Sequence, residues 1–483
     1  MSRALVWLRR DLRLADNPAL NHALAQGKTP VPVYIDDPEP EPRPGAASRW
    51  WLHHSLASLQ NNLRARGGDL VLLRGDSAEQ LQRLAVQTGA DAVYWNRLYE
   101  PHSVSRDKTL KTKLGEAGLD VQSFAASLLR EPWDLLKADG TPYRVFTPFW
   151  KALQKTGPSR APLEDLEALP ALKIGGDVGL SLEALQLLPR IGWDAAFPEF
   201  RQTGEQAAWQ QLHAFLDKAL DDYADDRDRP ALDGTSRLSA HLHFGELSPQ
   251  QIWQQTQHWM DTNTAPGAVA AAEAFLREVA WRDFAHHLLF HFPHTTQQPL
   301  DARYSTFPWR RDYTDDLRAW QQGRTGIPMV DAGMRQLWHS GWMHNRVRML
   351  VASLLTKNLL IPWQEGAAWF LDTLVDADLA NNSFGWQWTA GCGADAAPYF
   401  RIFNPVTQGE RFDPDGSYVR RWVPELEKLP PKWIHKPWQA PAAVLAEADV
   451  VLGENYPAPI VDLADSRRRA LAAWEGVKDQ SRQ

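Results

Sequence analysis

Cysteine is almost absent from this chain, and its scarcity excludes several kinds of site. Cys392 is the single cysteine in 483 residues, so neither an intrachain disulfide nor a metal site built from several thiolates can form. We expect Cys392 to be a buried, unreactive thiol. This cysteine usage is typical of a reducing compartment.

Membrane and export signals are also missing. No run of about 18 apolar residues is present, which excludes a membrane-spanning helix. Residues 1–13 carry several arginines among short apolar pieces, without the continuous apolar core and cleavage site of a secretory signal. The sequence therefore predicts a cytoplasmic protein.

The chain also lacks a net positive charge. A net charge of −7 argues against non-specific nucleic-acid binding by the whole surface, although a local basic patch can coexist with an acidic total. Residues 332–364 contain no Asp or Glu but include Arg335, Arg346, Arg348 and Lys357. Two interpretations stay open here: a basic patch that binds nucleic acid, and basic side chains that pair with acidic neighbours.

Tryptophan, in contrast, is abundant, with 23 residues. An indole needs close packing and a partner for its N–H group, so most of these residues are expected in the core. Trp281, Trp342, Trp386 and Trp388 lie among polar residues. For these four, a stacking or electron-carrying role competes with packing.

The first 130 residues alternate short apolar runs with helical patterns. Two helices are predicted at 48–66 and 78–88 from apolar residues near a period of 3.6. Such alternation predicts a doubly wound parallel sheet. No G-x-G-x-x-G follows the first strand, so the standard dinucleotide fingerprint is absent. The expected strands are 4–8, 31–35, 70–73, 92–95 and 121–124.

A chain of this length exceeds the usual size of a single core. Residues 156–189 are rich in Pro, Gly and Leu without a sustained period, which is typical of a connector. Strand signals stop after residue 199, and amphipathic helices are predicted at 273–292, 342–360 and 364–374. We therefore expect an α/β domain over 1–130, a connector over 131–199 and a larger all-α domain over 200–483.

The segment Asp376–Trp388 carries the clearest chemical pattern. If it is largely helical, Asp378, Asn382 and Trp386 share one face, and Trp388 points away from it. A face that combines carboxylate, carboxamide and indole suits a flat, polar, buried ligand better than an apolar core. The alternative is a solvated helix face with an incidental tryptophan.

Two further sets of residues at helical spacing and one turn also carry groups that can bind a ligand. The residues at helical spacing are Glu278, Trp281, Arg282 and Ala285 in one stripe and Trp342, Asn345 and Met349 in the other. The segment 233–239 combines a turn, three hydroxyls and an arginine before an expected helix start. Such a segment can bind phosphate through backbone N–H groups, although a turn and an N-cap are the simpler interpretation.

Together these motifs resemble those of the class I cyclobutane-dimer photolyases, in the photolyase/cryptochrome family, over nearly the full chain. The resemblance implies an N-terminal α/β antenna domain and a helical domain that holds FAD in a folded form. It also implies a light-driven carbon–carbon lyase that acts on pyrimidine dimers in DNA. The matching segments are 6–13, 234–239, 341–346, 376–388, 398–405 and 456–460.

The resemblance assigns FAD contacts by position. Asn382, four residues before Trp386, matches the residue beside the central-ring nitrogen of the flavin, where it influences which redox and protonation states persist. The full set of implied contacts is Tyr223, Thr235, Ser236, Arg237, Leu238, Ser239, Glu278, Arg282, Trp342, Asn345, Arg348, Asp376, Asp378 and Asn382.

The same resemblance implies a lesion pocket. Excited, reduced flavin in this family donates an electron to a dimer flipped out of the DNA. Trp281 and Trp388 match indoles that pack on the flipped bases, and base stacking is worth about 1–3 kcal/mol each. Glu278 matches a carboxyl that hydrogen-bonds the dimer. Met349 and Asn345 line the same cavity.

Three arginines and three tryptophans complete the implied sites. Arg227, Arg346 and Arg401 match arginines that contact DNA phosphates. A chain of indoles relays electrons inward to the flavin in the family. Its implied members here are Trp386, Trp363 and, outermost, Trp309.

Single residues argue for or against the other functions that this resemblance allows. A (6-4) photolyase needs paired histidines where this chain has Asn345 and Met349. A cryptochrome photoreceptor without repair activity usually carries Asp or Cys at position 382 and a long tail, and it stays as the alternative. A non-enzymatic, tryptophan-rich binding module would not explain the polar residues of 376–382.

The antenna chromophore is left undecided between methenyltetrahydrofolate and 8-hydroxy-5-deazaflavin. Folate-binding members carry a Glu a few residues beyond the Tyr-Glu pair, but here Tyr99 and Glu100 are followed by Pro-His-Ser. Deazaflavin-binding members carry a Lys where this chain has His243. Arg49 and the pair Trp50–Trp51 could line such a site, although a place on a helix face is the expected role. A monomer is expected.

Overall fold

The computed structural model describes residues 2–38, 43–172, 178–395 and 400–480. Its N-terminal part is a five-stranded, all-parallel sheet with strand order β3-β2-β1-β4-β5. Each expected strand is present within two residues of its predicted bounds, so the doubly wound α/β prediction is confirmed. The strands are β1 Arg3–Leu8, β2 Thr29–Asp36, β3 Val71–Arg74, β4 Ala90–Asn96 and β5 Asp120–Phe124.

Both faces of the sheet are covered because successive side chains of each strand point to opposite sides. Val6 and Leu8 face a core shared with α1 and α2, whereas Leu5 and Trp7 face a core shared with α3 and α4. The covering helices are α1 Pro18–Ala25, α2 Ala46–Ala65, α3 Ser77–Thr88 and α4 Pro101–Glu116.

The segment expected as a connector is packed along much of its length. It holds α5 Phe146–Thr156, η1 Glu183–Leu185, η2 Gly192–Asp194 and α6 Phe197–Phe200. Phe149 of α5 is buried in the helical domain, whereas Leu169 and Leu185 are buried against the α/β domain. The connector therefore packs against both domains.

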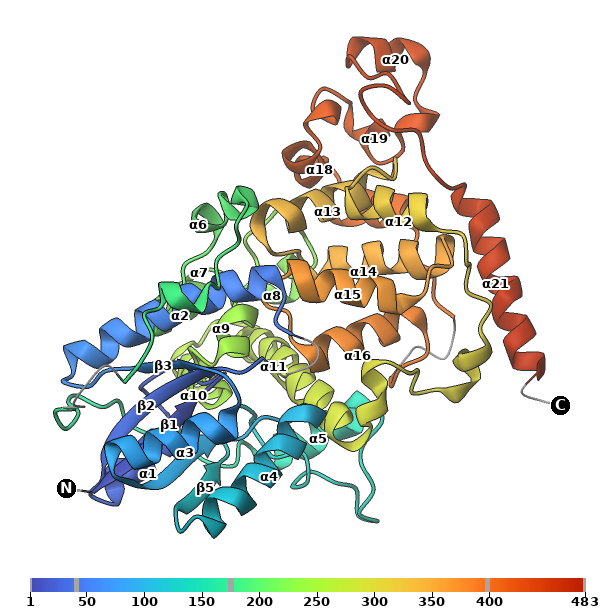
Figure 1. The fold of residues 1–483 in the computed structure, drawn as a ribbon. Coiled ribbons are helices and arrows are strands. Elements are labelled where there is room, and N and C mark those ends of the chain that lie inside the picture. Colours follow the sequence, from blue (N-terminus) through green and yellow to red (C-terminus); the bar gives the residue numbers. More distant parts are fainter. Residues whose placement is uncertain (1, 39–42, 173–177, 396–399, 481–483) are drawn as a thin grey trace.

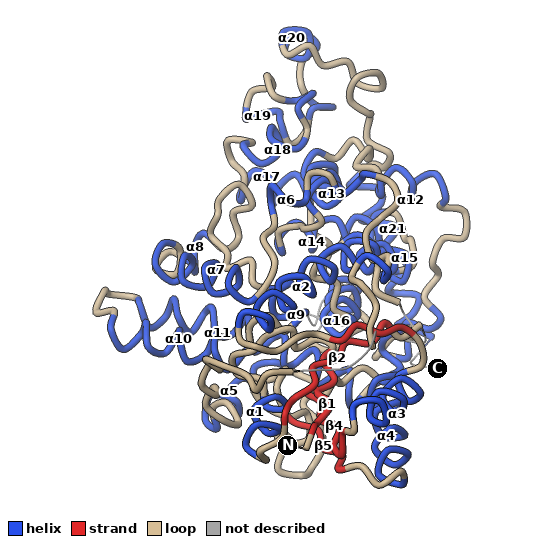
Figure 2. The backbone as a smooth tube through the Cα atoms, turned by 60° about the vertical axis from the view of Figure 1, so that its left-hand side comes forward, coloured by secondary structure: helices blue, strands red, loops and turns tan. Residues whose placement is uncertain are grey.

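The larger, C-terminal part is helical, as predicted (Figure 1). The helices α14, α15 and α16 are stacked in its centre, and α18 to α20 lie far from the sheet in Figures 1 and 2. Its α-helices are α7 Glu205–Lys218, α8 Tyr223–Asp226, α9 Ser239–Phe244, α10 Pro249–Thr262, α11 Ala268–His291, α12 Thr314–Gln321, α13 Pro328–Ser340, α14 Asn345–Ser353, α15 Trp363–Thr373, α16 Leu379–Ala390, α17 Pro405–Phe412, α18 Ser417–Trp422, α19 Pro431–Ile434, α20 Ala442–Glu447 and α21 Leu463–Gln480. Shorter elements are η3 Pro293–Thr296, η4 Ala302–Thr306, the π-helix η5 Leu354–Asn358, η6 Pro424–Leu426 and η7 Pro437–Gln439.

One predicted helix begins later than expected. The pattern predicted a helix over 342–360, but α14 starts at Asn345 because His344 caps it, its Nδ1 accepting from the backbone N–H of Arg346 at 3.1 Å. Trp342 therefore lies before the helix rather than on one stripe with Asn345 and Met349. The helical segment continues as η5.

Burial and hydropathy agree with two of the predictions. Cys392 is buried as predicted, and burial raises the pKa of its thiol to about 12. Among the described residues, no helix has the length and apolar character needed to cross a membrane.

The domains meet closely at the end of α9. Gly245 ends this helix with φ +65°, and a Cβ atom there would lie 2.1 Å from the carbonyl oxygen of Arg10, in the loop after β1. Two hydrogen bonds connect the domains at this place. The Leu12 backbone N–H donates to Phe244 O at 3.0 Å, and the Arg13 guanidinium donates to Gly245 O at 2.9 Å. Glycine is required here both for conformation and for space.

We predict that Gly245→Ala lowers the free energy of unfolding by about 3 kcal/mol, because the methyl group meets immovable backbone and the left-handed conformation is strained. Gly89→Ala is the matched control, since Gly89 has φ +64° and no atom within 4 Å of the place that its Cβ would take. It should cost only about 1 kcal/mol. Urea unfolding measures both, and equal losses would contradict the packing argument.

Candidate functional site

The segment Asp376–Trp388 is only partly helical. Asp378 is the N-cap of α16, with extended backbone, and its Oδ1 accepts from the Asn381 backbone N–H at 2.9 Å. The expectation that Asp378 shares a helix face with Asn382 and Trp386 is therefore wrong, because a capping side chain turns back over the first turn. Asn382 and Trp386 do share a face, at i and i+4.

A buried carboxylate, Asp376, precedes this helix. Its Oδ2 accepts from Arg348 at 2.8 Å and from the Ser239 hydroxyl at 2.6 Å. Burial alone would raise the pKa of Asp376, but the charge of Arg348 and these hydrogen bonds outweigh burial and hold the pKa below its ordinary value. Asp376 is therefore a carboxylate at neutral pH, and it joins α9, α14 and α16.

Three arginines surround this one carboxylate. Arg201 and Arg237 each lie 5.2 Å from the centre of the Trp342 ring, and Arg348 pairs with Asp376. Burial and the neighbouring charge of Arg237 lower the pKa of Arg201 to about 9. Arg237 also forms an ion pair with Asp233 at 2.9 Å, and the Asp233 side chain is 76% exposed. A bound anion would relieve this excess of positive charge on half-buried side chains.

Arg201 was missed by the sequence reasoning. It lies just after α6, at the end of the connector, and no motif surrounds it. Its place beside Trp342 depends on how the connector packs, which no local pattern encodes.

The predicted phosphate-binding turn lies beside these arginines. Arg237 has a left-handed backbone, φ +51°, which is strained for a residue with a Cβ. Thr235 and Ser236 are half-buried, and α9 begins at Ser239. Tyr223 and Leu238 are buried in the core of the helical domain.

Several buried polar atoms have no hydrogen-bond partner among the described residues, and Oδ1 of Asp376 and Nε1 of Trp386 are among them. Leaving such a group unpaired costs about 1–3 kcal/mol. A ligand with a ring N–H group and a diphosphate would use the carboxylate oxygen and the arginines together. The residues present therefore fit FAD.

Two of the predicted cofactor contacts, Arg282 and Asn382, form hydrogen bonds within the chain. Arg282 donates to Ser127 O at 2.5 Å and to Leu242 O at 3.4 Å. The Asn382 carboxamide donates to Ala367 O of α15 at 2.9 Å. These side chains are fixed in place before any ligand arrives, which favours a preorganised site.

The predicted lesion residues come from three helices. Glu278 and Trp281 lie on α11 and are half-buried. On α14, Asn345 is exposed and Met349 is half-buried. Trp388 lies on α16 and is half-buried. One face of the Trp281 ring is stacked on Phe146, with centroids 3.5 Å apart and planes at 10°. The Trp388 Nε1 donates to Asp395 O at 3.1 Å.

The acid-free segment 332–364 is neutralised from elsewhere in the chain. Arg335 pairs with Glu425 at 2.8 Å, Arg346 with Asp228 at 2.5 Å and Arg348 with Asp376 at 2.8 Å. Of the two interpretations, pairing with acidic neighbours is the one observed for these arginines.

The remaining DNA-contact candidates differ in their surroundings. Arg227 pairs with Glu278 at 2.8 Å. Arg401 is exposed, with its guanidinium 5.8 Å from the centre of the Phe403 ring. Part of the motif 398–405 to which Arg401 belongs, Pro398 and Tyr399, lies outside the described residues.

The predicted electron-relay tryptophans lie at different depths. Trp386 and Trp363 are both 2% exposed, and Trp309 is half-buried. Trp386 packs closely on α15, since a Cβ at Gly366 would lie 2.0 Å from its ring. Its aromatic neighbours include Phe370 at 5.0 Å and Trp320 at 6.1 Å.

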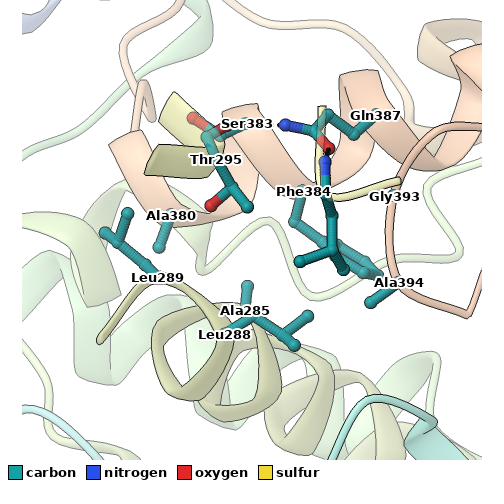
Figure 3. A pocket seen from close by; sticks show the side chains of 11 residues that line it. Ala285, Leu288, Leu289, Thr295, Ala380, Ser383, Phe384, Gln387, Gly393 and Ala394 are labelled. Atoms are coloured by element: carbon teal, nitrogen blue, oxygen red, sulfur yellow. Dashed lines mark hydrogen bonds between the residues drawn. The ribbon is translucent and has the colours of Figure 1, made fainter. Parts of the chain in front are cut away.

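A small cavity between α11 and α16 is too small for a cofactor (Figure 3). Its volume of about 20 Å³ corresponds to one water molecule. Ala380, Ser383 and Gln387 line it from α16, and the Gln387 amide bridges Leu300 N–H and Thr295 O. This face of α16 differs from the one that carries Asn382 and Trp386.

Comparisons with known proteins agree with this geometry. Residues 4–171 match the family model described as DNA photolyase, and residues 275–476 match the one described as FAD binding domain of DNA photolyase. The chain belongs to the photolyase/cryptochrome family. The helical domain of this photolyase-family chain thus carries the FAD-binding fold.

Individual relatives cover nearly all of the chain. A deoxyribodipyrimidine photo-lyase of Agrobacterium fabrum is 49% identical over 475 residues, 98% of each protein. Cryptochrome-2 of Arabidopsis thaliana is 41% identical over 97% of this chain and 78% of its own length. The crystal structure of a bacterial class III photolyase from Agrobacterium tumefaciens has 48% identity and a TM-score of 0.95, covering 99% of this chain and 98% of that one.

We predict that Arg348→Met lowers the free energy of unfolding by about 3 kcal/mol at neutral pH, because the Asp376 carboxylate is left buried without its cation. The lowered pKa of Asp376 stabilises the fold above the ordinary carboxyl pKa and stops doing so as pH falls. The loss should therefore shrink in acid.

Arg335→Met is the matched control, since its partner Glu425 is 27% exposed whereas Asp376 is 1% exposed. This variant should cost less than about 1 kcal/mol. Urea unfolding at neutral and acid pH separates the two, and a pH-independent loss in Arg348→Met would argue against the role of Asp376.

Proposed function

We propose that this chain is a light-driven enzyme that repairs cyclobutane pyrimidine dimers in DNA and uses FAD as its cofactor. The observation that carries the proposal is the cluster of the buried Asp376 and three half-buried arginines, next to the helix that presents Asn382 and Trp386. The photo-lyase name of the Agrobacterium fabrum relative supports the activity.

The subclass is part of the proposal. The sequence motifs suggested class I, but the Agrobacterium tumefaciens structure, at 48% identity, is titled a class III photolyase. We therefore assign class III to this chain in place of class I.

The chain would hold FAD through its two best-defined features. Arg201, Arg237 and the turn with Thr235 and Ser236 would bind the diphosphate, because backbone N–H groups and guanidinium groups converge there. The free Oδ1 of Asp376 would accept from a ring N–H group. Reduced FAD supplies the electron on illumination, and the protein supplies position and electrostatics. The predicted contacts Tyr223, Leu238, Ser239, Glu278, Arg282, Trp342, Asn345, Arg348, Asp378 and Asn382 stay part of the proposal.

The lesion pocket is proposed on the exposed side of this site. Trp281 has one ring face covered by Phe146, so only its other face could stack on a base. Glu278 would hydrogen-bond the dimer and stabilise charge that arrives on a carbonyl oxygen. Trp388, Met349 and Asn345 would complete the pocket.

DNA binding would require exchange of ion-pair partners. Arg227 and Arg346 are paired with Glu278 and Asp228, so a DNA phosphate must compete with these carboxylates, whereas Arg401 is exposed. Such contacts weaken steeply with salt. We also propose Trp386, Trp363 and Trp309 as the path by which electrons reach the cofactor.

A blue-light photoreceptor without repair activity is the second candidate, because Arabidopsis thaliana Cryptochrome-2 is 41% identical. Asn382 favours repair, since photoreceptors of the family usually carry Asp or Cys there. The identity of an antenna chromophore, folate or deazaflavin, stays open, and cytoplasmic location and a monomeric state stay predictions.

We predict that Glu278→Ala lowers dimer repair per absorbed photon by about tenfold and changes affinity for dimer-containing DNA by less than about threefold, because the carboxyl acts on transferred charge. Glu273→Ala, an exposed residue of the same helix, is the control and should leave both unchanged. Equal loss of repair and binding would assign Glu278 to DNA binding alone.

The purified protein should be yellow and, after reduction, should remove cyclobutane dimers from DNA only in blue light. Absorption spectra and a dark-controlled dimer assay measure the two properties on one sample. A protein without flavin would refute the proposal, whereas flavin without light-dependent loss of dimers would favour the photoreceptor.

A further inference from the structure

Five ionisable side chains, four buried and one half-buried, lie together where the two domains meet. Arg10 follows β1 and Glu100 precedes α4 in the α/β domain, whereas His243, His286 and Asp378 come from α9, α11 and the N-cap of α16. Glu100, His243, His286 and Asp378 are each at most 7% exposed. Arg10 forms an ion pair with Glu100 and lies 4.0 Å from Asp378 Oδ2.

The geometry around His286 determines its protons. Its Nδ1 lies 3.0 Å from the backbone oxygen of Arg282, which can only accept, so Nδ1 carries a hydrogen. Its Nε2 lies 3.5 Å from Asp378 Oδ2. Burial would raise the pKa of Asp378, but its histidine neighbours outweigh burial and hold the pKa well below its ordinary value. Both ring nitrogens of His286 therefore face acceptors.

The charge balance agrees with a doubly protonated ring. Glu100 and Asp378 contribute two negative charges, and Arg10 contributes one positive charge. His243 does not supply the other, because burial and Arg10 lower its pKa. An imidazolium at His286 makes the cluster neutral, whereas a neutral ring would leave one buried negative charge uncompensated, which is costly.

Asp378 connects this cluster to the first turn of α16. One of its oxygens accepts from the backbone N–H of Asn381 at 2.9 Å and from the Asn381 side chain at 2.8 Å. The other faces His243 at 3.4 Å and His286 at 3.5 Å. Asn382, which follows Asn381 in the chain, donates its backbone N–H to the backbone oxygen of Asp378 at 2.8 Å. The start of α16 is therefore fixed through Asp378.

We propose that His286 is a positioning residue whose imidazolium holds Asp378, and thereby sets the place of Asn382 against the cofactor. The inference rests on the proposed function, because that function assigns Asn382 to the flavin. It ties the cofactor environment to the domain interface, since Arg10 and Glu100 of the α/β domain complete the charge cluster.

Other charged groups also surround His286. Those that face it are Glu100, Asp378, Asp283 and Tyr99, and Arg10 and His243 lie against the same oxygen of Asp378. Burial raises the pKa of Asp283 to about 6. A bound cation is the competing explanation, since ligand atoms of Glu100, His286 and Asp378 all lie within 4.8 Å of one another and Glu100 Oε2 has no partner among the described residues.

The test uses holoprotein and compares His286→Gln, which keeps a donor but loses the charge, with His286→Lys, which keeps a cation. His287→Gln is the matched control: His287 is buried on the same helix, but its Nε2 accepts from the Tyr143 backbone N–H at 3.1 Å and burial lowers its pKa to about 4. The readouts are the rate of FAD release and the flavin absorption band at neutral pH.

His286→Gln should release FAD about tenfold faster than the wild type at neutral pH, the change expected from one weakened buried contact. His286→Lys should restore slow release, and His287→Gln should release FAD at the wild-type rate. Nitrogen NMR of labelled histidines should show both nitrogens of His286 protonated at neutral pH.

Two results would overturn the proposal. One is a wild-type rate of FAD release in His286→Gln. The other is one equivalent of divalent metal in the purified wild type that is lost in His286→Gln, which would assign the cluster to a cation. Neither readout depends on dimer repair, so a protein that binds FAD but repairs nothing would refute the proposed function and leave this inference to its own test.

Discussion

One carboxylate, that of Asp378, joins the two domains and the first turn of α16. It caps the helix that carries Asn382 and Trp386, and it faces two histidines and an arginine that belong to three other elements. A cap alone contributes about 1 kcal/mol, but a cap that is also part of a buried, charge-balanced cluster cannot move without leaving charges unpaired. The geometry of α16 therefore depends on the domain interface.

A second buried carboxylate, Asp376, lies two residues away and has a different role. It faces Arg348 and an arginine cluster in which positive charge exceeds negative charge. The contrast between the two acids is informative: Asp378 faces two histidines and an arginine, whereas positive charge exceeds negative charge around Asp376. An overall net charge of −7 thus hides a local site of the opposite sign.

The acid-free segment 332–364 shows the limits of a linear charge pattern. Its sequence left open a basic patch or pairing with acidic neighbours, and Arg335, Arg346 and Arg348 each meet a carboxylate from a distant segment. Burial next to a carboxylate stabilises each guanidinium. An open basic surface is therefore not preformed at these residues, because each guanidinium already has a carboxylate partner.

The sequence by itself determined the parallel sheet, the helical second domain and the motif residues near α16, because local periodicity and long motifs encode them. It also predicted the buried thiol of Cys392. Only the tertiary structure decided that Asp378 is a cap, that Trp342 precedes α14, that Arg201 reaches the site from the connector, and that His286 faces Asp378. Each of these depends on which distant side chains meet, and pairwise electrostatics and packing between segments leave no trace in a local pattern.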